Sequence, residues 1–503
     1  MIKAGYIFTD RAVLQCGMPV PVWGETDANE LKVSFGGQTV TATVKDGHFR
    51  ATLAPMTANT RGEMRIFSEN EELILSDIVT GEVWLAGGQS NMEHPNICAE
   101  VDPATLEDDP DYRLFTVPRR TEDAPRVGWH FEALYGEDTP WEYSTPETAL
   151  HFSSIAYAFG RKLRKELGVP VGIISCNWGG TPAEAWVRRE LLDADPEFSA
   201  YGKWWDARFV GLDIDAYRER DREYQEWKRE YFKKRGDIAE EVARIGVAAS
   251  LRDPGPSRWT EEGPLHPSVP GGLRKYMVAR ITPYAVRGTV WHQGESNARG
   301  GQADTRSYYT RLMQTLIADW RESFECPEMA FGIVQLATFA GAEGEKETYC
   351  RIREAQSDLG DGRDPLVYTV PSADLGEPDN IHPARKPEMG ERLALGALCK
   401  VYGTDTVWEG PKPTGMICTG DALEIIFDRP VTTPDKTPGD FFCHTDTGER
   451  VLLHAEIDGE GNIRLTLPEG TVPTEVGYVL QNWCRANLFG EDGLAVTPFL
   501  LKI

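Results

Sequence analysis

The sequence lacks any apolar run long enough to cross a membrane. No stretch of its 503 residues approaches the roughly 20 consecutive apolar residues that span a bilayer. The N-terminal segment MIKAGYIFTDRAVLQCG also lacks the apolar core of a secretion signal, and β-type runs begin in it at once. The chain is therefore expected to be cytoplasmic, with no membrane as a partner.

Positive charge is scarce compared with negative charge. The chain has 53 Lys and Arg residues against 79 Asp and Glu residues, which gives a formal net charge of −26. A field of this sign repels nucleic-acid phosphates and anionic membrane surfaces, so we expect no nucleic-acid partner. Because acidity also aids solubility, it does not by itself indicate a substrate.

Patterned cysteine and histidine residues are absent as well. The nine Cys form no CxxC pair, and an odd number makes a poor disulfide framework, so reduced thiols are the simpler interpretation. The nine His include no HExxH motif, and those outside the candidate site lack the spacing of metal ligands. We expect no metal and no organic cofactor.

The composition and the order of elements predict a globular chain of about three domains. Residues 1–78 alternate short β-type runs with turns, including one at Asp46-Gly47. Residues 79–404 alternate strands with helices, which predicts an α/β fold with a mostly parallel sheet covered on both faces. A helical and loop insertion is expected at about residues 200–270, and residues 405–503 return to a β module.

The first candidate catalytic residue is Ser90, in the segment AGGQSNME. It follows a predicted buried strand and two glycines, where a turn can present its hydroxyl and a following helix can offer backbone N–H donors. A serine in such a turn is more often only a helix cap. The segment also departs from the GxSxG motif, because Met92 stands where that motif has glycine.

The second candidate is the pair Asp379 and His382 in DNIHP. An aspartate three residues before a histidine can hold the imidazole Nδ1–H, which leaves Nε2 free to take a proton from a serine. Asp374 is a competing carboxylate. An isolated DxxH is more often a surface turn.

Two further segments supply hydrogen-bond donors after predicted strands. In NWGGTPAEAW the backbone N–H of Gly179 or Gly180 is suited to stabilise an oxyanion, and in WHQGESNA the side chain of Gln293 or Asn297 is suited to the same task. Glu295 in the second segment is expected to be a buried structural acceptor that braces the Ser90 turn.

Taken together, these motifs resemble the carbohydrate-esterase branch of the SGNH hydrolases, and most closely the sialate O-acetylesterase family. The resemblance rests on GQSNME at 88–93, GGTPAEAW at 179–186, RGTVWHQGESNA at 287–298 and DNIHP at 379–383. It implies an SGNH-hydrolase (flavodoxin-like) three-layer core with a parallel sheet, flanked by N- and C-terminal β modules.

The resemblance also implies a role for each matching residue. Ser90 would be the nucleophile, His382 the general base and Asp379 its orienter. The oxyanion hole would comprise the Ser90 amide, the Gly179/Gly180 turn and the Gln293 side chain. The remaining candidates for substrate contact or support are Gln89, Asn91, His292, Glu295 and Asn297.

The sequence departs from the family pattern at two places. His292 stands where the family commonly has tyrosine, and LRKYMV at 273–278 replaces a shorter, less charged motif. Both changes bear on which sugar is bound more than on the reaction.

The implied activity is that of a serine carbohydrate O-acetylesterase, a carboxylic ester hydrolase that releases acetate from a sialate 9-O-acetylesterase-like substrate. The expected partner is a small acetylated sugar or oligosaccharide. One alternative is an esterase acting on acetyl xylan, acetyl mannan or another plant glycan. An alternative of another class is a non-catalytic carbohydrate-binding protein on an esterase scaffold. The sequence does not indicate the oligomeric state.

Overall fold

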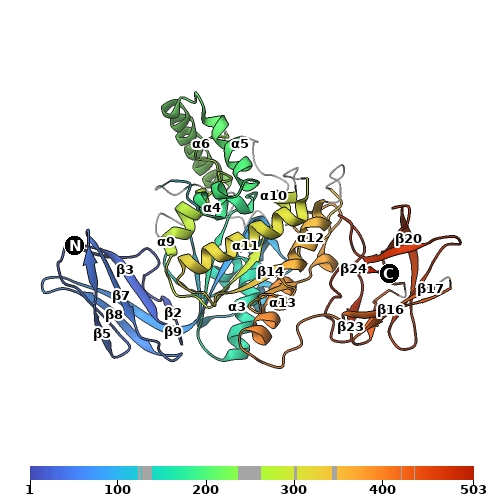
Figure 1. Cartoon of the computed structure of the whole chain (residues 1–503). Coiled ribbons are helices and arrows are strands. Elements are labelled where there is room, and N and C mark those ends of the chain that lie inside the picture. Colours follow the sequence, from blue (N-terminus) through green and yellow to red (C-terminus); the bar gives the residue numbers. More distant parts are fainter. Residues whose placement is uncertain are drawn as a thin grey trace. The chain divides into compact units, whose positions relative to one another are not determined.

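A computed structural model describes residues 1–122, 126, 139–235, 262–298, 303–341, 348–420, 422–435 and 437–503. The chain divides into two compact units. The first comprises Met1–Trp291 and Leu312–Phe331, and the second comprises His292–Arg311 and Gly332–Ile503. Figure 1 labels their helices and strands. Within these ranges, no helix combines the length and the hydrophobicity that a membrane span requires.

The first unit begins with β-strands, as the sequence predicts. A four-stranded antiparallel sheet has the order β1-β3-β7-β6, formed by Ile2–Ala4, Val20–Thr26, His48–Leu53 and Thr43–Lys45. Buried and exposed residues alternate along β7, so that Phe49, Ala51 and Leu53 are buried. Asp46 and Gly47 have φ values of 51° and 78°, which form the predicted tight turn between β6 and β7.

Strand β9 joins this β region to the α/β core. It runs without a break over Glu72–Gly88, through the predicted boundary at residues 78 and 79. Its first half pairs with β8 (Arg61–Phe67), its middle with β2 (Val13–Gln15) and its second half with β12 (Val171–Asn177). Residues 72–77 are mostly exposed and residues 78–88 are buried. The division into 1–78, 79–404 and 405–503 stays a prediction.

Two short strands complete the β region of the first unit. They are β4 (Lys32–Phe35), which pairs with β8, and β5 (Gln38–Thr41), which pairs with β4.

The core sheet of the first unit has the strand order β11-β10-β12-β9-β13. Its other strands are β10 (Asp109–Thr116), β11 (Glu142–Ser144) and β13 (Gly288–His292). Strands β10, β12 and β9 are parallel, and β12 is buried along its whole length, as in sheets covered on both faces. Since parallel strands end at the same edge, the chain leaves β9, β10 and β12 at neighbouring points.

Helix α3 (Ser154–Leu167) packs against β10 and β12. The Ser153 hydroxyl accepts a hydrogen bond from the Ala156 amide at 3.2 Å, which caps the N-terminus of the helix. Gly168 follows the last turn with φ of 66°, a conformation that glycine adopts without steric cost. A capping serine before the helix and a glycine just after it are sequence signals of helix ends.

Helix α4 (Arg189–Ala194) precedes the predicted insertion, which contains most of α5 (Phe198–Phe209) and all of α6 (Ile214–Arg235). Residues 236–261 lie outside the described ranges, and residues 262–270 form turns and bends. On α6 the rings of Tyr224, Trp227 and Tyr231 stack in succession, with centroids 5.8 and 5.7 Å apart. After the insertion, a π-helix covers Arg274–Val278 and α9 covers Ala279–Ile281.

The second unit also contains strands and helices in alternation. Strands β14 (Ala330–Val334) and β15 (Val367–Val370) are neighbours. Helices α12 (Thr348–Leu359) and α13 (Lys386–Lys400) pack against β15. Helix α10 (Glu295–Ala298) belongs to the second unit, whereas α11 (Thr305–Ser323) has Thr305–Arg311 in the second unit and Leu312–Ser323 in the first.

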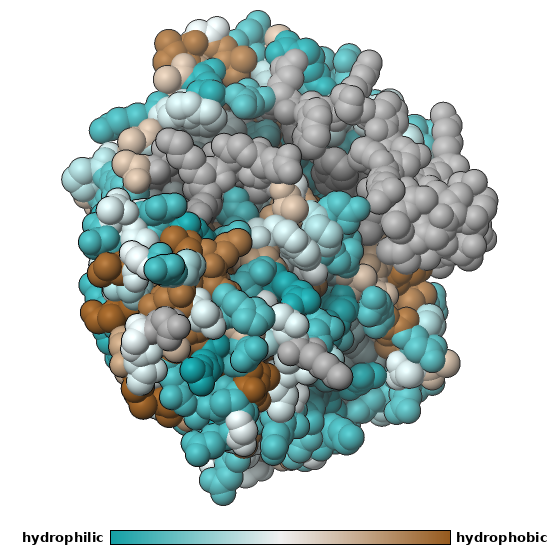
Figure 2. Space-filling view, turned by 90° about the vertical axis from the view of Figure 1, so that its right-hand side faces the viewer, coloured by the Kyte–Doolittle hydropathy of each residue, from teal (hydrophilic) through white to brown (hydrophobic). Residues whose placement is uncertain are grey.

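The C-terminal part of the second unit is the predicted β module. Its seven-stranded sheet has the order β16-β17-β21-β20-β19-β22-β24, and β18 pairs with β23. Leu423, Ile425, Phe441 and Tyr478 belong to its hydrophobic core. In the space-filling view of Figure 2, hydrophobic residues form separate groups among hydrophilic ones. The strands are Pro413–Thr419, Ala422–Phe427, Val431–Thr432, Phe441–Thr445, Arg450–Ile457, Ile463–Thr466, Pro473–Tyr478, Phe489–Gly490 and Phe499–Lys502 for β16 to β24.

Candidate active site

Ser90 lies at the turn that follows β9 in the first unit. Gly88, the last residue of the strand, has φ of 138°, a conformation that side chains other than glycine rarely adopt. The chain then enters the short helix α1 (Ser90–Glu93). Gln89 and Asn91 are only 3% and 2% exposed, whereas Ser90 is half-buried. The turn therefore presents the serine and packs its two neighbours inside.

The turn after β12 lies directly against Ser90. Asn177 at the end of β12 is in register with Gly88, and the Trp178 amide donates to the Gly88 carbonyl at 3.1 Å. A Cβ atom added at Gly179 would lie only 3.2 Å from the Cβ of Ser90. The structure thus brings Ser90 and the predicted Gly179-Gly180 turn together, and a side chain at position 179 would require Ser90 or Glu93 to shift by a few tenths of an ångström.

The two glycines of this turn differ in whether their backbone N–H groups form hydrogen bonds. The Gly179 N–H donates to the Glu93 carboxylate at 2.6 Å, and Glu93 also pairs with the buried Arg119. The Gly180 N–H makes no hydrogen bond within the part of the chain that the structure describes. A carboxylate thus holds the Gly179 amide in this structure, which favours Gly180 as the donor from this turn, and the oxyanion role of either glycine stays a prediction.

His382 belongs to the second unit, in a turn held by hydrogen bonds. The Asn380 side chain accepts from the His382 amide at 3.0 Å and donates to the His382 carbonyl at 2.9 Å. The Glu377 carboxylate accepts from Asn380 at 3.0 Å and from the Ala384 amide at 2.8 Å. Burial, and then the positive charge of Lys386, lower the pKa of His382 to about 3, so the imidazole is neutral at pH 7.

Neither predicted carboxylate partner contacts His382 in this structure. Asp379 is exposed, and no hydrogen bond or ion pair joins it to His382 within the described ranges. Asp374, the competing carboxylate, forms a buried bidentate ion pair with Arg392 at 2.7 and 2.6 Å. Asp374 is thus committed to a structural contact, and the role of Asp379 as orienter stays a prediction.

The Gln293 side chain is buried in the second unit and held at both ends. Its amide nitrogen donates to Asn297 at 2.7 Å, and its amide oxygen accepts from the Tyr309 hydroxyl at 2.9 Å. The Gln293 carbonyl accepts from Tyr309 at 2.7 Å and from the Gln356 side chain at 3.0 Å. This network fixes the amide in place, while its role in the oxyanion hole stays a prediction.

Buried ionisable side chains surround this network. His292 is buried, and neither of its ring nitrogens has a hydrogen-bond partner in the described part of the chain, although Nε2 lies 3.9 Å from the Glu295 carboxylate. Burial is the main cause that holds the pKa of His292 well below its usual value, with Lys386 and His382 next. His292 and Glu295 therefore lie close together, and their supporting role stays a prediction.

Lys386 is a functional candidate that the sequence did not reveal. It is only 1% exposed, and burial lowers its pKa to about 7, against the opposing effect of Glu295 and Glu377. A lysine at the first turn of a helix is ordinarily solvated, so no local pattern marks this one as buried. Glu93 was also missed as a separate residue, although it lies within the GQSNME motif.

Within the described ranges, no group of three or more His, Cys, Asp or Glu side chains is arranged to hold a metal ion. All nine cysteines are free thiols. Ser90, Gln89, Asn91, Gly179 and Gly180 belong to the first unit, and the other predicted site residues belong to the second. The catalytic triad as a whole therefore stays a prediction.

Comparisons with known proteins agree on one family. Residues 257–399 match the family model described as carbohydrate esterase, sialic acid-specific acetylesterase. The sialate O-acetylesterase of Mus musculus is 26% identical over 388 residues, which cover 72% of this chain and 64% of that protein. The human sialate O-acetylesterase is 25% identical over 455 residues, covering 82% and 73%.

A solved structure extends the similarity to the whole chain. The crystal structure of a carbohydrate acetylesterase from Xanthomonas citri matches with a TM-score of 0.74 and 26% identity, covering 99% of both chains. The predicted fold class, an SGNH-type α/β core with flanking β modules, is confirmed. The chain is a relative of the sialate O-acetylesterases and contains, at residues 257–399, the domain that their family model describes.

Proposed function

We propose that the protein is a serine carbohydrate O-acetylesterase that removes acetyl groups from a sugar. The observation that carries this proposal is the half-buried Ser90 at the end of β9, with the Gly179-Gly180 turn packed directly against it. A serine hydroxyl beside a free backbone N–H is the arrangement that acyl transfer requires, because a nucleophile and an oxyanion donor must face the same carbonyl.

The reaction proceeds in two halves. The Ser90 oxygen attacks the acetyl carbonyl carbon while its proton passes to Nε2 of neutral His382. The negative charge that develops on the carbonyl oxygen is stabilised by the Gly180 N–H, with the Ser90 amide and the Gln293 side chain as further donors. The bond between the carbonyl carbon and the sugar oxygen then breaks, and His382 returns the proton to that oxygen.

Water completes the cycle. It loses a proton to His382 and attacks the acetyl-serine, and acetate leaves as Ser90 regains its hydrogen. Because burial lowers the pKa of His382, its ring is neutral at pH 7, as the base must be at the start of each half-reaction. The steps use no metal and no organic cofactor.

Acetate release tests the proposal most directly. We expect the protein to hydrolyse 4-nitrophenyl acetate and to release acetate from at least one member of a panel of O-acetylated sialic acid, acetylated xylan and acetylated mannan. The order of the acetate-release rates within this panel distinguishes a sialate O-acetylesterase from an esterase that acts on plant glycans. No hydrolysis of any ester would refute the proposal and favour a non-catalytic carbohydrate-binding protein.

A further inference from the structure

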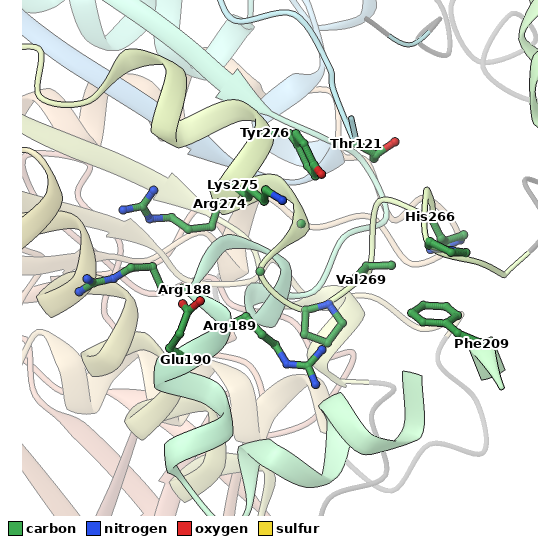
Figure 3. A pocket seen from close by; sticks show the side chains of 14 residues that line it. Thr121, Arg188, Arg189, Glu190, Phe209, His266, Val269, Arg274, Lys275 and Tyr276 are labelled. Carbon is green, nitrogen blue, oxygen red and sulfur yellow. The ribbon is translucent and has the colours of Figure 1, made fainter. Parts of the chain in front are cut away.

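A cavity of about 400 Å³ in the first unit has no part in the reaction steps above. Figure 3 shows its lining, which includes the π-helix residues Lys275 and Tyr276 and, from other segments, Thr121, Glu190 and His266. Its volume falls within the range of roughly 300 to 1,000 Å³ typical of small-molecule sites. π-Helical turns frequently occur at functional sites, and this one coincides with the segment LRKYMV, in which the sequence departs from its family.

The cavity lies at the same edge of the core sheet as Ser90. Thr121 comes after the end of β10, and Glu190 comes after the end of β12 and its Gly179-Gly180 turn. Strands β10, β12 and β9 are parallel neighbours, so these segments leave the sheet beside the Ser90 turn. The ion pair between Arg119, two residues before Thr121, and Glu93 of helix α1 joins the two regions directly.

Most of the positive charge around the cavity is already neutralised. Arg188 lies 2.6 Å and Arg274 3.1 Å from the same buried carboxylate, Asp319. Arg189 pairs with Asp193 at 2.8 Å and with Asp206 at 2.6 Å. The Lys275 ammonium is different, because it lies 4.8 Å from the centre of the Tyr276 ring and forms no ion pair with any described residue. It is the cation of the lining that remains available to a ligand.

Two neutral polar side chains of the lining, Thr121 and His266, can form hydrogen bonds with a ligand. Thr121 is 4% exposed, and its hydroxyl makes no hydrogen bond within the described residues. Burial lowers the pKa of His266 to about 4, so its ring is neutral at pH 7. Its Nδ1 accepts a hydrogen bond from the Ser268 amide at 3.1 Å, which places the ring hydrogen on Nε2 as a donor. A hydroxylated ligand supplies partners for both groups.

We propose that this cavity is a subsite for a sugar ring of the acetylated substrate, with Tyr276 and Phe209 as apolar contacts and Thr121 and His266 as hydrogen-bond partners of its hydroxyls. Lys275 favours a ring that carries a carboxylate, and Glu190 accepts hydrogen bonds from hydroxyls at the rim. Aromatic walls with a few polar groups are typical of sites that hold small polar ligands. This inference rests on the proposed esterase function, of which it names the substrate-binding determinants.

The test compares a large substrate with a small one. kcat/KM is measured for an O-acetylated sialic acid, an acetylated xylo-oligosaccharide and 4-nitrophenyl acetate, whose leaving group is not a sugar. We expect Tyr276→Ala and Thr121→Val to lower kcat/KM for the sugars, relative to 4-nitrophenyl acetate, at least fivefold through KM. Lys275→Met should lower it for the sialic acid only. Thr121→Ser keeps the hydroxyl and should retain the wild-type ratio of kcat/KM for the sugars to kcat/KM for 4-nitrophenyl acetate. Lys165→Met, which changes an exposed lysine of α3, is the matched control for Lys275→Met.

Two outcomes overturn the subsite. One is that Tyr276→Ala and Thr121→Val leave kcat/KM for the sugars unchanged relative to 4-nitrophenyl acetate. The other is an equal loss of kcat/KM on all three substrates, which indicates a structural role. A wild-type protein that hydrolyses no ester refutes the proposed function instead. In that case, calorimetric titration with free N-acetylneuraminic acid and xylobiose tests the cavity alone, and binding that Tyr276→Ala does not weaken removes it as a sugar site.

Discussion

The carboxylate of Glu93 accepts a hydrogen bond from the Gly179 amide at 2.6 Å and thereby ties the helix that begins at Ser90 to the turn that follows β12. Arg119, which is buried and pairs with the same carboxylate, lies with its guanidinium 5.4 Å from the centre of the Trp178 ring. One side chain thus sets the spacing between the candidate nucleophile and the candidate oxyanion donor, Gly180.

Removing this carboxylate should affect the rate as well as stability. We expect Glu93→Ala to lower kcat on the order of 10- to 100-fold, because the Gly180 N–H is no longer held in place and because small displacements of catalytic groups are costly. The melting temperature should also fall, since the buried Arg119 loses the ion pair with Glu93. Glu93→Gln keeps an acceptor for Gly179 and should lose less activity. If kcat per folded molecule is the same in Glu93→Ala as in the wild type, the carboxylate has only a structural role.

Ser90→Ala should abolish ester hydrolysis while the fold remains intact. Loss of a triad nucleophile typically costs on the order of 10³ to 10⁶ in rate, and Ser90 is half-buried in a turn that alanine can also form. His382→Ala should behave alike. Steady-state rates measure the loss of activity, and thermal melts show whether the variants are folded. If Ser90→Ala keeps more than about a tenth of the wild-type rate, Ser90 is not the nucleophile.

The pH dependence of kcat/KM reports on the environment of His382. The ring must be neutral to accept a proton, and its pKa is lowered to about 3. Activity should therefore be constant between about pH 5 and 7 and fall only as the pH approaches 3, far below the ordinary histidine pKa of about 6.5. Rates measured from about pH 4 to 8 check this.

An acid limb at or above about pH 6.5 would contradict that expectation and indicate a carboxylate paired with the ring during the reaction. Asp379→Asn then identifies that carboxylate, since the limb should move to lower pH only if Asp379 supplies it. Asp374→Asn is the comparison, although its loss leaves Arg392 without its buried partner and should lower the melting temperature.

Gln293→Leu should lower the melting temperature. The substitution removes the side-chain hydrogen bonds that Gln293 makes with Asn297 and with the Tyr309 hydroxyl, while the bond from Tyr309 to the backbone carbonyl of residue 293 remains. Each lost hydrogen bond costs about 0.5–1.5 kcal/mol. Measuring kcat per folded molecule then shows whether Gln293 also acts in the oxyanion hole. A fall of about 10² to 10³ would add an oxyanion role to the structural one, whereas an unstable but fully active variant would remove Gln293 from the mechanism.

Local sequence patterns predicted the elements that carry the site. Strand-then-glycine segments indicated the turns at Ser90 and Gly179, and the capping serine and terminal glycine of α3 marked both ends of that helix. These features depend on backbone conformation over a few residues. The sequence could therefore place them without knowledge of distant contacts.

Contacts between distant residues were not predictable in the same way. The bond from Gly179 to Glu93 joins positions 86 residues apart. Asp374 and Asp379 both precede His382 by a few residues in the sequence. Only the structure shows that Asp374 pairs with Arg392 and that Asp379 is exposed. Burial of Lys386 likewise follows from the packing of a whole helix.

The continuity of β9 has a consequence for how such chains can be engineered or recombined. The N-terminal region cannot be exchanged as a cassette, because a cut at residue 78 severs the strand that leads to Ser90. It would also strip β2 from the middle of β9 and remove Gln15, whose side-chain oxygen accepts from the Val83 amide at 2.8 Å. A chain truncated there would leave Val79–Gly81 of β9 without the strand β2, and we expect such an exposed strand edge to cause aggregation.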